Sequence, residues 1–117
     1  MSRDIEKWLS KFKHAWIEKD IDRVMALFTD KVEYYETPFL KFEDKKQLRD
    51  EWETIQKQED VNLNFEVFNS EDDRFTIIWS LTYTENGNTC ESKGAYLIEL
   101  NSENKCYRFA QYPVTPK

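Results

Sequence analysis

Apolar residues recur every three or four positions in the first part of the chain, which predicts two consecutive helices. The first pattern covers about four turns, and its apolar stripe consists of Ile5, Trp8, Leu9, Phe12, Ala15 and Trp16. Asp20 is expected to cap the second, shorter helix, because its side chain can accept hydrogen bonds from the free backbone N–H groups of a first turn. The stripe of that helix consists of Ile21, Val24, Met25 and Phe28 and ends near Asp30.

A short strand and a third helix follow. Residues 31–36 are rich in side chains that favour strands, and Pro38 is expected to end this strand because proline cannot donate to a central ladder. Asp44 followed by Gln47 resembles a capping box, which predicts a helix running to about residue 58. The buried face of that helix is expected to carry Leu48, Trp52 and Ile55.

The rest of the chain alternates between apolar and polar residues, the pattern of half-buried strands. The two clearest apolar series are Leu63, Phe65 and Val67, and then Phe75, Ile77, Trp79, Leu81 and Tyr83. The Asn-Gly pair at 86–87 favours a tight hairpin turn, so a strand over residues 89–101 should pair back on the preceding strand. The last strand is predicted over residues 105–112 and is expected to be closed by Pro113 and Pro116.

The predicted order ααβαββββ describes an α+β domain in which three helices pack on a curved, mostly antiparallel sheet. A chain of 117 residues suits one hydrophobic core, so we expect a single domain over residues 1–117. Aromatic residues make up 15% of the chain, so this core should be built from few, large side chains.

Charge and composition narrow the classes of function. A formal net charge of -6 argues against a nucleic-acid partner, which requires clustered basic residues. No apolar run is long enough to cross a membrane, and the first residues carry charges, so a cytoplasmic protein is expected. Cys90 and Cys106 are then interpreted as reduced thiols. With a single histidine, His14, on the polar side of the first helix, no metal site is expected, and the two glycines form no nucleotide-binding loop, so no cofactor is expected.

Three features together carry a family resemblance. They are the spacing from Trp16 through Asp20 to the pair Leu27 and Phe28, the pattern of Asp30, Val32 and Tyr34 with Pro38 shortly after it, and the order of elements over the whole chain. In these the chain resembles the nuclear transport factor 2-like (NTF2-like) superfamily, and within it the SnoaL-like and ketosteroid-isomerase-like branch. The resemblance implies a cone-shaped fold with a pocket between the helices and the concave face of the sheet. It leaves the function open, because this fold hosts isomerases, cyclases and binding domains.

The same resemblance places a general base at the end of the first strand, where this sequence has Glu36. Burial among aromatic residues raises the pKa of such a carboxyl toward a useful range; the alternative is a solvated residue at the rim. The family's hydrogen-bond donors match Phe12, which cannot donate, and Tyr96, which can donate or can simply be a core tyrosine. A SnoaL-type acid on the last strand has no counterpart in residues 105–112, which weakens a cyclase interpretation.

Other residues are predicted to line the pocket as ligand contacts. Tyr34 has the same strand parity as Glu36, and Phe39 is expected to turn back over the pocket as a lid or plug. The remaining candidates are Phe12, Trp16, Trp52, Trp79, Phe109 and Gln111. Arg108 can receive an anionic ligand or form a cross-strand ion pair with Glu91 or Glu99.

Three functions are consistent with these patterns. The first is binding of a small, mostly apolar molecule in an aromatic pocket. The alternative is a cofactor-free isomerase or cyclase-like enzyme, with Glu36 moving a proton and Tyr96 donating a hydrogen bond. The third is an interaction module whose pocket is filled by its own side chains. In each case an uncharged outer row favours a homodimer through that sheet face; the row consists of Thr76, Ile78, Ser80, Thr82 and Thr84.

Overall fold

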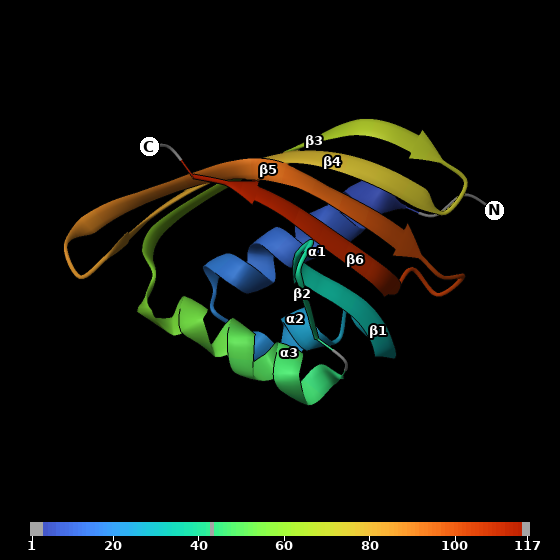
Figure 1. Ribbon diagram of the computed structural model, residues 1–117, viewed down its shortest axis with the longest axis horizontal. Coiled ribbons are helices and arrows are strands. Elements are labelled where there is room, and N and C mark those ends of the chain that lie inside the picture. Colours follow the sequence, from blue (N-terminus) through green and yellow to red (C-terminus); the bar gives the residue numbers. More distant parts are fainter. Residues whose placement is uncertain (1–3, 43, 116–117) are drawn as a thin grey trace.

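The computed structural model describes residues 4–42 and 44–115 and has an α+β architecture, as the sequence predicts. The helical elements are α1 (Ile5–Ile17), α2 (Ile21–Met25), α3 (Lys45–Trp52) and the 3₁₀ helix η1 (Glu53–Lys57). The strands are β1 (Phe28–Thr37), β2 (Leu40–Phe42), β3 (Glu59–Glu71), β4 (Arg74–Glu85), β5 (Asn88–Leu100) and β6 (Cys106–Val114). The long strands arch over the helices, which all lie on one side of the sheet (Figure 1).

The six strands form one sheet in the order β2-β1-β6-β5-β4-β3. Neighbouring strands are antiparallel except for β1 and β6, which run parallel. The prediction that Pro113 closes the last strand is wrong, because β6 continues to Val114. Pro113 pairs with Gly94 of β5, whereas the pairing of β6 with β1 extends only to Ala110. The missing N–H of Pro113 therefore removes no hydrogen bond to β1. Pro116 lies outside the described residues.

The segment around Pro38 also differs from the prediction. The chain does not leave the sheet there but turns tightly into β2, which pairs back onto β1. The Phe39 backbone N–H donates to Thr37 Oγ1 at 3.1 Å and so supports this turn. The register shifts between Tyr35 and Thr37, as in a β-bulge. A proline is compatible with this hairpin because it sits in the turn and not in the ladder.

The helices begin where their capping residues predict and end earlier than expected. Asp20 accepts a hydrogen bond from the backbone N–H of Arg23, and Asp44 accepts one from Gln47. The second helix ends at Met25, so Phe28 is the first residue of β1 and not the last turn of a helix. The third α-helix ends at Trp52, and the 3₁₀ turn η1 carries the chain on to residue 57.

The core consists of closely packed aromatic rings between α1 and the sheet, which meet both face to face and edge to face. All six residues of the predicted α1 stripe are buried. Phe12 lies at the centre, with its ring centroid 5.0 Å from Trp8, 5.4 Å from Trp52 and 6.1 Å from Tyr96. The indole N–H of Trp8 donates to the Leu27 carbonyl at 3.1 Å, which satisfies a polar atom inside this apolar layer. The remaining space between α3 and the sheet forms the candidate site.

Candidate functional site

A cavity of about 290 Å³ lies between the concave face of the sheet and the segment formed by α3 and η1. Its walls are largely aromatic and include Trp16, Tyr34, Trp52, Trp79 and Tyr83. Two carboxyl side chains, Glu36 of β1 and Glu51 of α3, also line it. No lysine, arginine or histidine is among the lining residues in the described part of the chain.

Glu36 sits near the end of β1, just before the hairpin turn, and is partly buried. Gln111 of the neighbouring β6 donates from Nε2 to Glu36 Oε1 at 3.2 Å and to the Glu36 carbonyl at 3.3 Å. Burial, and secondly the charge of Glu51, raise the pKa of Glu36 to about 7, against the opposing effect of hydrogen bonds from Gln111 and Tyr34. Near neutral pH this carboxyl can therefore either give or take a proton.

Tyr34 lies two residues before Glu36 and faces the same side of the sheet. Its ring stacks on Phe109, with centroids 4.7 Å apart and planes 10° apart. Its hydroxyl lies close to the Trp52 side chain and to the Glu36 carboxyl. Burial, and then the charge of Glu36, raise the pKa of Tyr34 well above its ordinary value. Tyr34 therefore remains a neutral hydrogen-bond donor to Glu36 at any physiological pH.

Tyr96, the second predicted catalytic residue, is buried beneath the cavity and is not among its lining residues. Its ring stacks on Trp79 at a centroid distance of 5.3 Å and lies 4.8 Å from Phe109. Burial, followed by the charge of Glu36, raises the pKa of the Tyr96 hydroxyl far above its usual range. The structure thus brings Tyr96 into electrostatic contact with Glu36 but covers it with Trp79.

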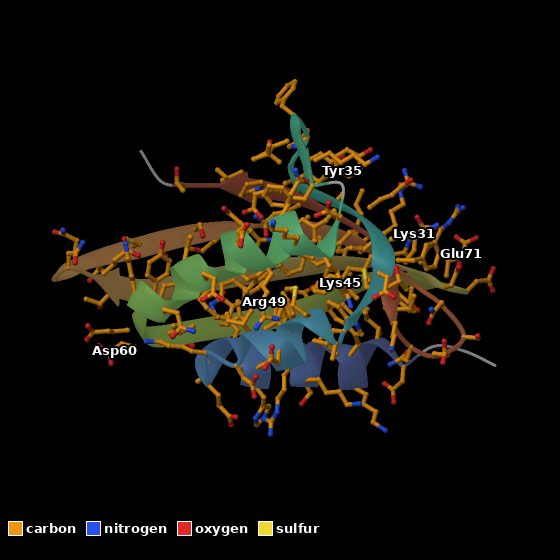
Figure 2. All side chains as sticks on the ribbon, turned by 90° about the horizontal axis from the view of Figure 1, so that it is seen from below. Lys31, Tyr35, Lys45, Arg49, Asp60 and Glu71 are labelled. Carbon is orange, nitrogen blue, oxygen red and sulfur yellow. The ribbon has the colours of Figure 1, made fainter. Side chains whose placement is uncertain are left out.

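Three of the predicted ligand contacts lie elsewhere. Phe12 and Phe109 are fully buried in the aromatic core and do not line the cavity. The expectation that Phe39 forms a lid is wrong, because its side chain is 99% exposed. The physical reason is the hairpin turn, which carries Phe39 away from the body of the domain; this hairpin projects beyond the sheet next to Tyr35 (Figure 2).

The other predicted contacts line the cavity: Trp16, Tyr34, Trp52, Trp79 and Gln111. Trp79 depends on Gly94, its partner on β5, because a Cβ at that position would lie 2.9 Å from the Trp79 ring and would collide with the Tyr112 carbonyl. The buried Trp79 indole N–H has no hydrogen-bond partner among the described residues. An unsatisfied buried donor is costly, so this atom marks a place where an acceptor would be favourable.

Sequence reasoning missed several lining residues, and Glu51 is the most informative of them. Leu48, Glu51, Trp52 and Ile55 follow the i, i+3, i+4, i+7 pattern of one helix face. The sequence signal that could have identified this residue is the presence of a glutamate, Glu51, on an otherwise apolar helix face. Gln58 gave no such signal, although it is buried and its Oε1 accepts the Trp16 indole N–H at 2.8 Å.

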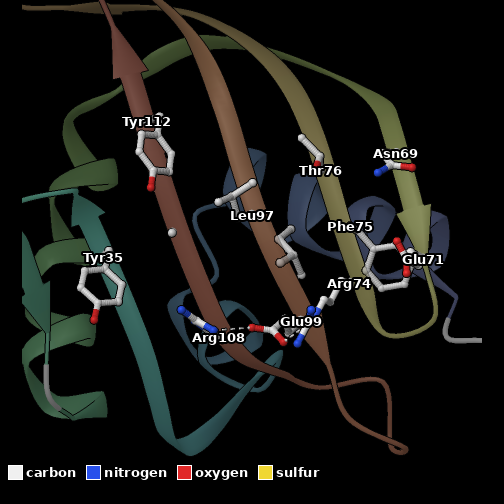
Figure 3. Close-up of a pocket in the computed structure, with 12 residues that line it drawn as sticks. Tyr35, Asn69, Glu71, Arg74, Phe75, Thr76, Leu97, Glu99, Arg108 and Tyr112 are labelled. Carbon is white, nitrogen blue, oxygen red and sulfur yellow. Dashed lines mark hydrogen bonds and ion pairs between the residues drawn. The ribbon is translucent and has the colours of Figure 1, made fainter.

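The opposite face of the sheet carries a second, more open depression of about 380 Å³ (Figure 3). Glu99 of β5 lies at its floor and accepts hydrogen bonds from Arg74 Nε at 3.2 Å and from Arg108 Nη1 at 3.1 Å. Arg108 also lies 3.8 Å from Glu33. Of the two cross-strand partners predicted for Arg108, the structure selects Glu99. Glu99 is thus paired with two arginines of the protein itself.

The chain is similar to a known protein family over most of its length. The SnoaL-like domain family matches residues 9–109. No curated protein matches the sequence at a significant level.

Several solved structures share the fold. A Δ5-3-ketosteroid isomerase from Mycobacterium sp. is 16% identical, with a TM-score of 0.80 over 94% of this chain and 92% of that one. RV0760c from Mycobacterium tuberculosis, in complex with estradiol-17β-hemisuccinate, is 18% identical, with a TM-score of 0.77 over 90% and 89%. A computationally designed 17-OHP binder is 20% identical, with a TM-score of 0.77 over 90% and 87%. At these identities the similarity establishes the fold and not the activity.

Proposed function

Since the chain belongs to the SnoaL-like domain family, within the NTF2-like superfamily, we propose that it binds a small, mostly apolar molecule in the aromatic cavity beside Glu36. The observation that carries this proposal is the cavity itself, in which five aromatic side chains form much of the wall and Glu36 is the polar group of most interest. Its volume of about 290 Å³ is near the lower end of the range of about 300–1,000 Å³ typical of ligand pockets. The similarity to a steroid-complexed protein and to a designed binder is consistent with such a role.

A cavity-filling variant tests the proposal. Small aromatic and polycyclic molecules are screened by melting temperature and tryptophan fluorescence, because several tryptophans line the cavity. Ser92 lines the cavity, so Ser92→Leu should abolish the response to any hit. The matched control is Ala95→Leu on the same strand, which adds a similar volume on the opposite face and should leave the response intact. If no molecule gives a response, or if both variants respond equally, the proposal fails.

A second candidate function is cofactor-free acid–base catalysis by Glu36, for example proton transfer next to a carbonyl group. It is favoured by one specific observation, the pKa of about 7 for a carboxyl that lines a cavity. Gln111 hydrogen-bonds this carboxyl and would hold it in place, with the Tyr34 hydroxyl close by, whereas Tyr96 would need Trp79 to move before it could touch a substrate. The test is turnover of ketone substrates by wild type and by Glu36→Gln. A loss of about 10²–10⁴-fold is expected for a general base, and equal rates would exclude the role.

We further propose that the outer sheet face joins two copies of the chain. Ile78, Leu97 and Tyr112 are each at least 40% exposed on this face, and a two-fold interface would cover them. Sedimentation equilibrium should give twice the chain mass of 14.2 kDa. A single species at the chain mass, up to high protein concentration, would contradict the proposal.

A further inference from the structure

The charges and hydrogen-bond donors of the cavity restrict which ligands it can take. This inference rests on the proposed binding function and adds the chemical class of the ligand. The groups that face Glu36 come from four elements: the Tyr34 hydroxyl of β1, Glu51 of α3, the Tyr96 hydroxyl of β5 and the Gln111 amide of β6. None of them is a cation. Two carboxyl groups therefore share one cavity without a positive partner in its lining.

Most N–H groups of the cavity wall already have acceptors within the protein. The Trp16 indole N–H donates to Gln58 Oε1 at 2.8 Å, Gln111 donates to Glu36, and the Trp52 side chain lies close to the Tyr34 hydroxyl. These donors cannot serve an anionic ligand without losing their present partners. Apart from the Trp79 indole N–H, which is itself buried, and the hydroxyl groups of the lining, the wall offers a ligand its carboxylates and the faces of its aromatic rings.

The aromatic rings are arranged in a way that suits a positive charge. The ring of Trp16 meets that of Trp52 edge to face, with centroids 4.9 Å apart and planes at 82°, so the two indoles form a corner. Trp79 and Tyr83 contribute further rings to the lining. The negative faces of aromatic rings attract cations, and tryptophan does so most strongly. A ring corner with two carboxylates is a combination that recognises ammonium groups.

We infer that the preferred ligand of this cavity is an organic cation, a protonated or quaternary amine carried on a flat apolar body. A metal ion fits less well: within residues 4–42 and 44–115, no three His, Cys, Asp or Glu side chains come together as a metal site, and hard cations need about six oxygen ligands. The formal net charge of -6 also favours the approach of a cation.

Three ligands of the same shape and different charge test the inference: 1-naphthylmethylamine, its neutral analogue 1-naphthalenemethanol, and the anion 1-naphthoate. Their affinities are measured by titration calorimetry at pH 7. The amine is expected to bind about tenfold tighter than the alcohol, because it adds a charge pair and a cation–π contact, and the acid should bind weakest. Glu36 is about half protonated at this pH, so binding of the amine should also release protons, seen as a heat that depends on the buffer.

Two variants test whether the preference for the amine arises from the cavity. Glu36→Gln should remove most of the preference for the amine over the alcohol. Glu53→Gln removes the same charge close by on η1, outside the cavity lining, and should leave the preference intact. Melting curves establish that both variants are folded.

The outcomes separate this inference from the function on which it rests. If the alcohol binds as tightly as the amine, or the acid binds tightest, the cation preference is overturned while binding in the cavity stands. If the amine preference survives in Glu36→Gln, the assignment to this cavity is overturned. If none of the three binds, both the inference and the binding function lose their support.

Discussion

Two glutamates on opposite faces of the same sheet have contrasting surroundings. Glu99 lies on the outer face, where two guanidinium groups, from Arg74 and Arg108, donate hydrogen bonds to its two oxygens. Glu36 lies on the inner face, among aromatic rings, where its charged neighbour is another acid, Glu51. One carboxylate is neutralised by the protein, and the other is left without a counter-charge.

This difference distinguishes a face whose paired charges stabilise the fold from a face whose unpaired acid is suited to a function. Paired charges on an open face contribute modestly to stability. An acid held in an apolar cavity next to a like charge is unfavourable when ionised, and the same cavity is lined by Trp79, whose buried indole N–H is unsatisfied. Such features concentrate at functional sites, so the inner face is the face to test for binding and the outer face the one to test for assembly.

The largest effect is expected from truncating adjacent residues of β5 that point to the two faces. Ile98 is 1% exposed in the inner core, and Leu97 is 43% exposed on the outer face. Ile98→Ala should lower the free energy of unfolding by about 2–5 kcal/mol, because it leaves a cavity, whereas Leu97→Ala should change that of a single chain by less than about 1 kcal/mol, any further loss coming from the proposed contact between two copies. Urea denaturation of both variants measures the contrast. Similar losses would mean that the outer face is as tightly packed as the inner one.

The next effect is the change in stability when each glutamate charge is removed at pH 8, which should have opposite signs for the two glutamates. In the folded protein the pKa of Glu36 is about 7, above its ordinary value of 4.5, so folding favours the protonated form. This contribution is fully present below about pH 4.5 and is lost as the pH rises through about 7. Glu36→Gln should therefore be about 3 kcal/mol more stable than wild type at pH 8 and nearly equal to it at pH 4.5.

Glu99→Gln is the matched control for that measurement. Removing its charge deprives two arginines of their shared acceptor, so it should destabilise the protein by about 1 kcal/mol at pH 8. The urea midpoints of unfolding of the two variants and of wild type, measured at pH 4.5 and 8, provide this comparison of stabilities. If both substitutions destabilise at pH 8, the proposed contrast between the two faces is wrong.

The smallest effect is expected at Phe39, which belongs to neither face. Because its side chain is 99% exposed at the hairpin tip, Phe39→Ser should change the unfolding free energy by less than about 0.5 kcal/mol. It should also leave the affinity of any cavity ligand unchanged. A drop in affinity would revive the expectation that this ring closes over the cavity, and calorimetry with the best ligand of the screen decides the question.

The fold was predictable from sequence because its signals are local and repeated. The α1 stripe, the aspartate caps and the alternation along β4 each fix an element within a few residues, and the structure confirms them. The β2 hairpin was not predicted. A proline is compatible both with the end of a central strand and with a tight turn between two paired strands. Only the pairing of β2 with β1 shows that Pro38 lies in such a turn.

The candidate site was predictable only in part. Strand parity placed Glu36 and Tyr34 on the same face, and the structure puts both on the cavity wall. Tyr96 and Phe109 were also predicted as site residues, but the sequence could not tell the cavity lining from the layer beneath it. That distinction depends on how the aromatic rings stack on one another, for example Trp79 over Tyr96. Such packing in three dimensions leaves no local pattern in the sequence.

The parallel pairing of β1 with β6 has a consequence for how the chain folds. The meander of β3, β4 and β5 joins strands that are close in sequence, so it can form early. By contrast, β1 pairs with β6, a strand about 75 residues further along the chain (Tyr34 pairs with Phe109), so this pairing is expected to form later. During synthesis, Glu36 and the hairpin that follows it cannot take their places until the last strand has left the ribosome. The cavity is therefore the last part of the domain to be completed.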